Sequence, residues 1–358
     1  MTSRERVINA LDFKRTDRIP RYEIFLPGFI DKWRKAKNMP DDSWIYDYYN
    51  KVDIGTVIAD QHGPYYSKAA ILKREGSAYY ELDSWGRILY KKQNAFFEKE
   101  VDVAIKEKGK EPPFESPLDK NRQKAFMDIP PKFKESFALV SGVLGLYMGC
   151  SRLRGEVQFL MDIAEDEPYC KYLAERLADF TTELGLSIVE ITDTKNTAIW
   201  VYDELSSRTG PLFSPNSFYK IFFPCYKKMI DTWKKNGVKN VILHCDGNSL
   251  PLLDIIIEAG FTGIQSLAPT TGMWLPDVKT KYGNRLSLIG GMCNIYTLSS
   301  GTKTEIEKQV KAIIEAAKEG GVIIGTHSID EDIPVENYDY YYSVLEKYDE
   351  MWPVGSGE

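Results

Sequence analysis

The chain contains three histidines, and each lies at or just after the end of a short apolar segment rich in β-branched residues. His62 follows DIGTVIAD, His244 ends NVILH, and His327 follows GVIIGT. Ligands of α/β proteins bind where the strands of a parallel sheet end. The three histidines therefore predict a shared pocket at the mouth of such a sheet.

The tetrapeptide His244-Cys245-Asp246-Gly247 is the most specific of these motifs. Side chains alternate along a strand, so His244 and Asp246 should point to one side and Cys245 to the other. With His327 they would offer two imidazoles and one carboxylate, a plausible set for a catalytic zinc or Fe(II) ion that keeps open positions. The spacing alone also fits a hydrogen-bonded pair that orients a loop.

Two adjacent acids follow another apolar segment, AIWVY. Asp203 and Glu204 could form an acid/base or substrate-binding pair, and ion pairs with Arg208 are the alternative. His62 precedes a Gly-Pro turn, so it could donate a proton, contact substrate or cap a loop.

Further polar residues stand at the ends of other segments, and they are candidates for substrate binding. Glu23 could instead pair with Arg21, and Cys293 could be a metal ligand or an inert buried thiol. The set comprises Glu23, Gln265 and Cys293, with Asp60, Gly142, Gly145 and Ser266 at equivalent positions.

These residues must be positioned by the segments that precede them. Most of the segments lack period-two alternation, which is typical of strands buried on both faces of a parallel sheet. Eight strands alternating with helices in 358 residues predict a (β/α)8 barrel, and a doubly wound open sheet is the alternative. In the barrel, His327 can meet His244 and Asp246 only over the central mouth. The predicted strands are Ile19–Ile24, Ile54–Ala59, Phe137–Leu144, Ala198–Tyr202, Asn240–Leu243, Gly263–Leu267, Leu286–Ile289 and Gly321–Gly325.

The rest of the chain is assigned around this barrel, and we expect a single domain over residues 1–358. An N-terminal helix within residues 1–18 should begin after Thr2 or Ser3. An inserted antiparallel hairpin or meander is expected over Ala69–Lys91, after the second strand, with a surface loop over Lys106–Asp119. The main predicted helices are Tyr169–Ile191, Pro215–Asn236 with Ser214 as N-cap, Leu250–Ala259 and Thr304–Lys318.

Composition narrows the partners and the compartment. The net charge is −6, and no basic face stands out, so nucleic acid and anionic membranes are not expected partners. The apolar runs are too short to span a bilayer, and the N-terminus lacks the apolar region of a signal peptide. Five cysteines without a CxxC motif indicate reduced thiols in a cytoplasm.

Several motifs resemble those of the uroporphyrinogen decarboxylase superfamily, in matching order and spacing. They are SRERVINALDFKRTDRIP, SRLRGEVQFLMDIAEDEP, YDELSSRTGPLFSPNSFYKIFFPCYKKM, HCDGN, GNRLSLIGGMC and GTHSIDEDIPVEN. The resemblance covers nearly the whole chain and implies the (β/α)8 barrel. It also implies one of two activities, cofactor-free decarboxylation of uroporphyrinogen or cobalamin-dependent methyl transfer with zinc.

Two departures from the family patterns favour the methyltransferase branch but change its metal site. The decarboxylases carry an M-R-Q-A-G-R segment that grips substrate carboxylates, whereas RYEIFLPGF here keeps only Arg21. The methyltransferases bind zinc through H-x-C and a later Cys before P-x-E-N. In this chain the resemblance places His244 at the His, Asp246 at the first Cys and His327 at the second, ahead of Pro334-Val335-Glu336-Asn337.

The expected function is methyl transfer between a small molecule and a corrinoid cofactor. The chain shows no D-x-H-x-x-G cobalamin-binding loop, so the corrinoid is expected on a separate protein. The N/O donor set suits an oxygen substrate such as a methoxylated aromatic, with zinc as Lewis acid and Asp203, Glu204 or His62 as proton donor. The alternatives are methyl transfer from the corrinoid to a thiol or other acceptor, a metal-free decarboxylase of a uroporphyrinogen-like or smaller acid held by Arg21 and Arg208, and a non-catalytic small-molecule-binding barrel.

Overall fold

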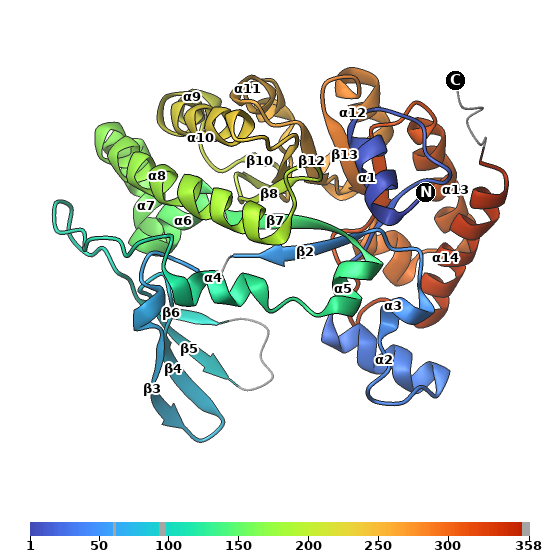
Figure 1. Ribbon diagram of the computed structural model, residues 1–358, viewed down its shortest axis with the longest axis horizontal. Coiled ribbons are helices and arrows are strands. Elements are labelled where there is room, and N and C mark those ends of the chain that lie inside the picture. Colours follow the sequence, from blue (N-terminus) through green and yellow to red (C-terminus); the bar gives the residue numbers. More distant parts are fainter. Residues whose placement is uncertain (60–61, 93–97, 353–358) are drawn as a thin grey trace.

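Eight parallel strands form the nearly closed barrel that the sequence predicts (Figure 1). The computed structural model describes residues 1–59, 62–92 and 98–352. The strand order is β1-β14-β13-β12-β11-β8-β7-β2, so sequential parallel strands are neighbours around the sheet. The strands are β1 (Arg21–Tyr22), β2 (Ile54–Ile58), β7 (Ala138–Leu144), β8 (Ile199–Tyr202), β11 (Val241–His244), β12 (Gly263–Ser266), β13 (Ser287–Gly291) and β14 (Val322–Gly325).

The two edges of the sheet, β1 and β2, are joined through Asp53 rather than through a regular ladder. The Asp53 N–H donates to the Arg21 carbonyl at 2.8 Å, and the Arg21 N–H donates to the Asp53 carboxylate at 2.9 Å. Arg6 and Arg18 also donate to this fully buried carboxylate, at 2.6 and 2.7 Å. Closure of the barrel thus depends on a buried ion-pair network.

Aromatic rings fill the barrel interior below its mouth. Tyr22 and Trp200 lie with ring centroids 5.1 Å apart, and Trp200 stacks on Tyr202 at 6.0 Å. At the other end, the Gly321 N–H donates to the Ala10 carbonyl of α1 at 3.0 Å, just before β14 begins. The N-terminal helix therefore closes the bottom of the barrel, while the rings form a floor beneath the strand ends.

Helices surround the barrel, and most predicted helices are confirmed. Thr2 caps α1 and Ser214 caps α9, each through its side-chain oxygen. The helix predicted over Pro215–Asn236 is wrong as a single element, because Pro224 lacks the N–H that would continue it and the chain starts a new helix there. The helices are α1 (Ser3–Leu11), α2 (Pro27–Lys37), α3 (Ile45–Tyr48), α4 (Lys120–Met127), α5 (Pro131–Ser136), α6 (Leu146–Arg154), α7 (Glu156–Glu165), α8 (Glu167–Thr192), α9 (Pro215–Ile221), α10 (Phe223–Lys235), α11 (Leu253–Ala259), α12 (Leu275–Tyr282), α13 (Lys303–Ala317) and α14 (Val335–Glu350).

The insertion after β2 is a four-stranded antiparallel sheet, which is larger than the predicted hairpin. Its strands are β3 (Ala70–Glu75), β4 (Ala78–Leu82), β5 (Ile88–Lys92) and β6 (Lys99–Asp102). β6 has the sequence KEVD and is mostly exposed, so no apolar alternation marks it. This sheet projects from the barrel below α4 in Figure 1.

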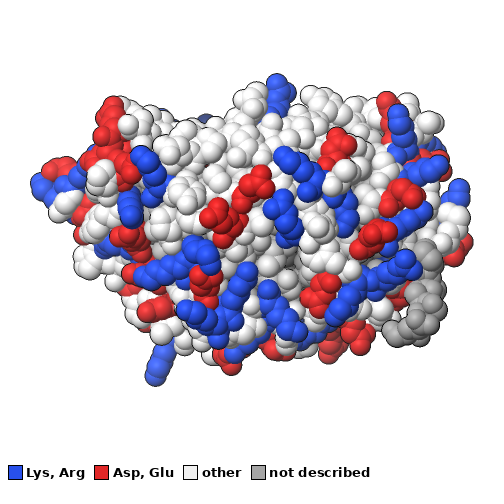
Figure 2. Space-filling model, turned by 90° about the horizontal axis from the view of Figure 1, so that it is seen from above, with Lys and Arg blue, Asp and Glu red and all other residues white. Residues whose placement is uncertain are grey.

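On the face shown in Figure 2, Lys and Arg side chains are interspersed with Asp and Glu side chains. Within the described part of the chain, no helix has both the length and the apolar composition needed to cross a bilayer.

Candidate metal centre

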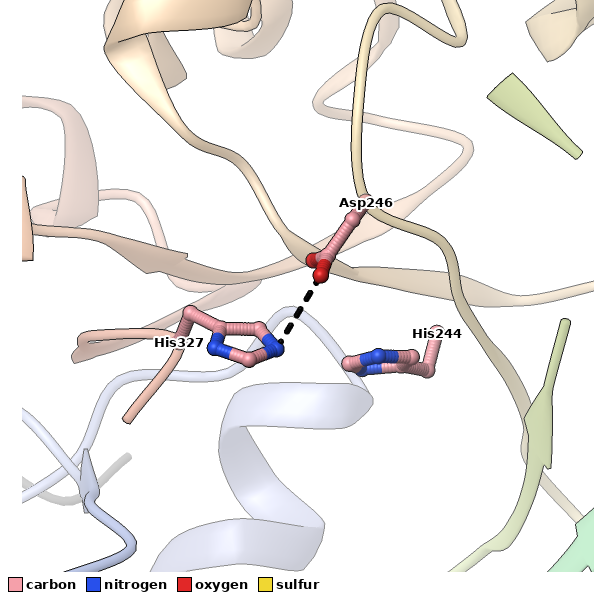
Figure 3. Close-up of side chains that lie close together, drawn as sticks. All are labelled: His244, Asp246 and His327. Atoms are coloured by element: carbon pink, nitrogen blue, oxygen red, sulfur yellow. Dashed lines mark ion pairs between the residues drawn. The ribbon is translucent and has the colours of Figure 1, made fainter. Parts of the chain in front are cut away.

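His244, Asp246 and His327 meet over the barrel mouth, as the sequence predicts (Figure 3). His244 is the last residue of β11, Asp246 follows it by two positions, and His327 follows β14. One ligand atom from each residue lies within 4.8 Å of those of the other two. His327 Nε2 is 3.1 Å from Asp246 Oδ2, and the two imidazole centroids are 5.5 Å apart.

The neighbouring strands hold the His244 imidazole in place. Its Nδ1 hydrogen-bonds to Gln265 Oε1 on β12, and its ring lies 4.9 Å from that of Tyr202 on β8. The amide oxygen can only accept, so Nδ1 carries the proton of this bond and Nε2 is left to bind a metal. Burial lowers the pKa of His244, but the hydrogen bond to Glu204 and the charges of Asp246 and Glu204 outweigh it and raise the pKa above its ordinary value.

The Asp246 carboxylate fits a cation. Its Oδ2 pairs with His327, whereas its Oδ1 is buried and makes no hydrogen bond of ordinary geometry, although the Ser266 hydroxyl is close enough to help lower the pKa of the carboxyl. Burial raises the pKa of Asp246, but the hydrogen bond and charge of His327 and the charge of His244 hold the pKa well below its usual range. An ionised, under-coordinated carboxylate oxygen beside two imidazoles matches the nitrogen and oxygen donors of catalytic zinc or Fe(II).

Glu204 borders this cluster, and its neighbour Asp203 does not. Glu204 Oε1 lies 3.5 Å from His244 Nε2, and Oε2 accepts the Asp246 N–H at 3.3 Å. Glu204 also lines a cavity of about 300 Å³ between α6 and the inserted sheet, together with Met148 and Arg87. It is therefore placed to act at the mouth.

Asp203 instead anchors the start of α6, and its prediction as part of an acid/base pair is not supported by its position. The carboxylate is fully buried and accepts the backbone N–H groups of Tyr147 and Met148 at 3.1 and 2.8 Å and the hydroxyl of Tyr226. Burial raises its pKa to about 6. A side chain on Gly145 would lie 2.3 Å from Asp203 Cβ, so glycine makes room for this anchor. Neither Asp203 nor Glu204 pairs with Arg208 among the described residues.

Glu23 lies close to the cluster through Thr326, the residue before His327. Glu23 Oε2 accepts from the Thr326 hydroxyl at 2.6 Å, and the Tyr341 hydroxyl also interacts with this carboxyl. Burial outweighs the lowering effect of both hydroxyls and raises the pKa of Glu23 to about 7. The alternative that Glu23 only pairs with Arg21 is wrong, because Arg21 donates to Asp349 at 2.6 Å.

The structure separates His62 from the other two histidines. Its ring stacks on Tyr66 at 4.7 Å and packs against Phe126 at 4.6 Å, and its carbonyl accepts from Arg122. Burial and then the charge of Arg122 lower the pKa of His62 to about 4. The expectation of one pocket shared by three histidines therefore holds for two of them. Asp60 lies outside the described residues.

The two other predicted substrate-binding residues have internal partners. Gln265 is fully buried and supports His244. Cys293 is buried, and its sulfur accepts the Tyr296 N–H at 3.5 Å at the start of the π-helix η4 (Asn294–Leu298). Cys293 is not part of the metal-ligand group found among the described residues.

Sequence reasoning missed a short hairpin that helps to enclose the site. Strands β9 (Ser206–Ser207) and β10 (Gly210–Pro211) pair after β8, and the turn between them carries Arg208. Two-residue strands give no periodic pattern, although Arg-Thr-Gly is a usable turn signal. The hairpin lines a cavity of about 290 Å³ with Asp246 and His327.

Comparisons with known proteins agree with this architecture. The family model for uroporphyrinogen decarboxylase matches residues 132–348, which is more than half of the chain. A methyltransferase from Methanosarcina mazei has a similar structure, with a TM-score of 0.70, 15% sequence identity and coverage of 97% of this chain and 99% of that one. At this identity the likeness shows the fold. No curated protein matches the sequence.

A second solved structure is only distantly similar. It is a B12-independent methionine synthase from Shewanella sp. W3-18-1 in complex with selenomethionine, with a TM-score of 0.38 and 10% identity. The alignment covers 60% of this chain and 61% of that one. This similarity is too low to support an argument.

Proposed function

Because the chain belongs to the uroporphyrinogen decarboxylase family, we propose that it is a methyltransferase that moves a methyl group between a small molecule and a separate corrinoid protein. The observation that carries the proposal is the convergence of His244, Asp246 and His327, with ligand atoms within 4.8 Å, at the mouth of the barrel. These residues would hold zinc or a similar divalent ion. When bound, the metal would supply Lewis-acid polarisation of a substrate oxygen.

The surrounding residues have separable tasks in this proposal. Gln265 holds His244 with Nε2 directed at the site. Glu204, 3.5 Å from that nitrogen, can hold the proton that a departing oxygen needs. Glu23, with a pKa of about 7, is a second proton-holding group one residue away from His327 through Thr326.

The donor set supports an oxygen substrate such as a methoxylated aromatic. All three ligand atoms are nitrogen or oxygen, and Cys245, inside the same motif, places its sulfur 3.2 Å from the Ser249 hydroxyl instead. Thiolate-rich sites favour softer metals and match thiol activation, whereas N/O sites suit harder oxygen ligands. Transfer to a thiol acceptor is therefore the less favoured direction of the same chemistry.

The position of Arg21 argues against the metal-free decarboxylase. The Arg21 side chain is 1% exposed, bonds to Asp349 and lies over the Tyr342 ring. It is thus unavailable to grip a substrate carboxylate at the mouth, and Arg208 is left alone of the predicted pair. A cavity of about 290 Å³ is also at the small end of ligand pockets, which suits a single-ring compound better than a tetrapyrrole.

Elemental analysis of protein purified without a histidine tag tests the proposal. Wild type should contain about one zinc or equivalent metal per chain, and His244→Ala and His327→Ala should each lose it. The third histidine offers a matched control, because His62→Phe keeps the stacking on Tyr66 and should retain the metal. Loaded wild type should then demethylate a methoxylated aromatic only when a corrinoid protein is present.

Metal-free wild type after careful preparation would refute the proposal. A decarboxylase and a non-catalytic binding barrel would then be the leading hypotheses, and release of carbon dioxide would distinguish the decarboxylase from the binding barrel. Metal that persists in both histidine variants would also contradict the assigned ligands.

A further inference from the structure

We infer that the cavity beside Asp246 and His327 selects a small organic anion, a methyl ether that also carries a carboxylate, and that Arg208 binds the carboxylate. This inference rests on the proposed function and specifies its substrate class. The cavity of about 290 Å³ has the two metal-ligand candidates on one wall and Arg208 on the hairpin turn that forms another. A ligand that fills it would span both.

Arg208 is free to bind a ligand. Its side chain is exposed and forms no ion pair or hydrogen bond within residues 1–59, 62–92 and 98–352. It is the sole Lys or Arg among the described residues that line this cavity, and the one carboxylate there, Asp246, is already paired with His327. Arg208 therefore offers a ligand a guanidinium group that is not paired with any described residue.

The hairpin that carries Arg208 is fixed against the loop that carries Asp246. The Asn248 N–H donates to the Ser207 carbonyl at 2.8 Å, and the Ser249 hydroxyl donates to that of Ser206 at 3.1 Å. Gly247 lies between the two elements with φ of +86°, and a Cβ there would be 2.4 Å from the Ser207 carbonyl oxygen. Only glycine permits this close approach, so the backbone of the hairpin is held against the loop that carries Asp246.

Further polar and apolar side chains line the cavity. Ser266 is 3% exposed, and its hydroxyl lies close enough to the Asp246 carboxylate to help lower the pKa of that group. A buried hydroxyl that also lines the cavity can meet a polar ligand atom there. Ala268 and Ile295 supply apolar surface.

The chemistry selects a carboxylate over a phosphate. A guanidinium group matches the planar carboxylate with two parallel hydrogen bonds. A single arginine compensates one negative charge, whereas a phosphate dianion would need further cations. The ligand is thus a monoanion with an apolar ring between the carboxylate and the methyl ether.

Calorimetric titration with para-methoxybenzoate and its neutral analogue para-methoxybenzamide tests the inference. Wild type should bind the carboxylate about tenfold more tightly than the amide, as expected for one charge-assisted contact at a partly exposed arginine. Arg208→Gln should bind the two probes equally, and Arg208→Lys should retain part of the preference. Arg285→Gln, at an exposed arginine that pairs with Asp254, is the matched control and should behave as wild type.

Equal affinity of wild type for the two probes, or no binding of either at millimolar concentration, would overturn the inference. So would an unchanged preference in Arg208→Gln. Titration of metal-depleted protein separates this inference from the proposed function: a carboxylate preference that persists in a chain shown to bind no metal supports the anion site even though the metal-dependent reaction has failed.

Discussion

Gln265→Leu tests whether the orientation of the His244 imidazole matters for metal binding, because it leaves all three candidate metal ligands in place. Gln265 is fully buried and stands directly opposite His244 in the β11–β12 ladder, where its Oε1 accepts from Nδ1 of the imidazole. Leucine has a similar size but no acceptor. The imidazole would keep its packing against Tyr202 and lose the partner that fixes its tautomer.

The expected loss can be bounded from these contacts. Removal of a partner that orients a ligand typically weakens metal binding by about 10- to 100-fold, or about 1.4–2.8 kcal/mol. The unsatisfied Nδ1 of His244 costs about 1–3 kcal/mol of folding free energy. Gln265 Nε2 is itself buried without a partner, so its removal offsets part of that loss. Because of this offset, the loss of metal-binding free energy should exceed the loss of unfolding free energy.

Competition against a chromophoric zinc chelator measures the effect. Gln265→Glu keeps an acceptor at the same place and adds a negative charge, so it should bind zinc at least as tightly as wild type. Gln123→Leu changes a glutamine on α4 that bonds to Ser187, and it should leave zinc affinity unchanged. If Gln265→Leu binds zinc as tightly as wild type, the hydrogen bond does not orient His244 and the reasoning is wrong.

Two further predictions concern the frame of the barrel. Asp53→Asn should lower the free energy of unfolding by about 3–5 kcal/mol, because it leaves Arg6 and Arg18 without their buried carboxylate. An unchanged midpoint of urea unfolding would show that this ion-pair network does not stabilise the closure of the barrel. Burial raises the pKa of Glu23 from 4.5 to about 7, so the folded state takes up a proton more readily than the unfolded state and stability should fall as the pH rises through that window. Glu23→Gln should flatten this slope in urea titrations at about pH 5 and about pH 7.5, and an equal slope in the variant would contradict the assignment.

The barrel could be predicted because most of its strands are buried on both faces. Segments such as Val322–Gly325 are continuous apolar runs that end at a polar residue, and this pattern survives in a single sequence. The elements that were missed carry no such pattern. β6 is charged and exposed, and β9 and β10 have two residues each.

Within the site, the alternation of side chains along a strand accounts for the directions of several residues. It correctly placed His244 and Asp246 on one side. The same rule separates Asp203 from its neighbours, since Tyr202 and Glu204 face the His244 side and Asp203 turns to α6. The role of Gln265 could not be found this way, because it depends on the register between β11 and β12, which one sequence does not specify.

One of the three candidate metal ligands lies on a strand and two lie beyond strand ends, and this indicates from which side we expect substrate to approach. His244 is supported from both sides in register, by Tyr202 of β8 and Gln265 of β12, and its side chain is only 11% exposed. Asp246 and His327 lie beyond the strand ends, and their side chains are 42% and 37% exposed. A metal held by all three would be shielded by the strands on the His244 side, whereas Asp246 and His327 also line the cavity that Arg208 borders. Arg208 lines the same cavity as Asp246 and His327 but is not one of the three candidate metal ligands, so changes to Arg208 should alter the choice of ligand without altering metal content.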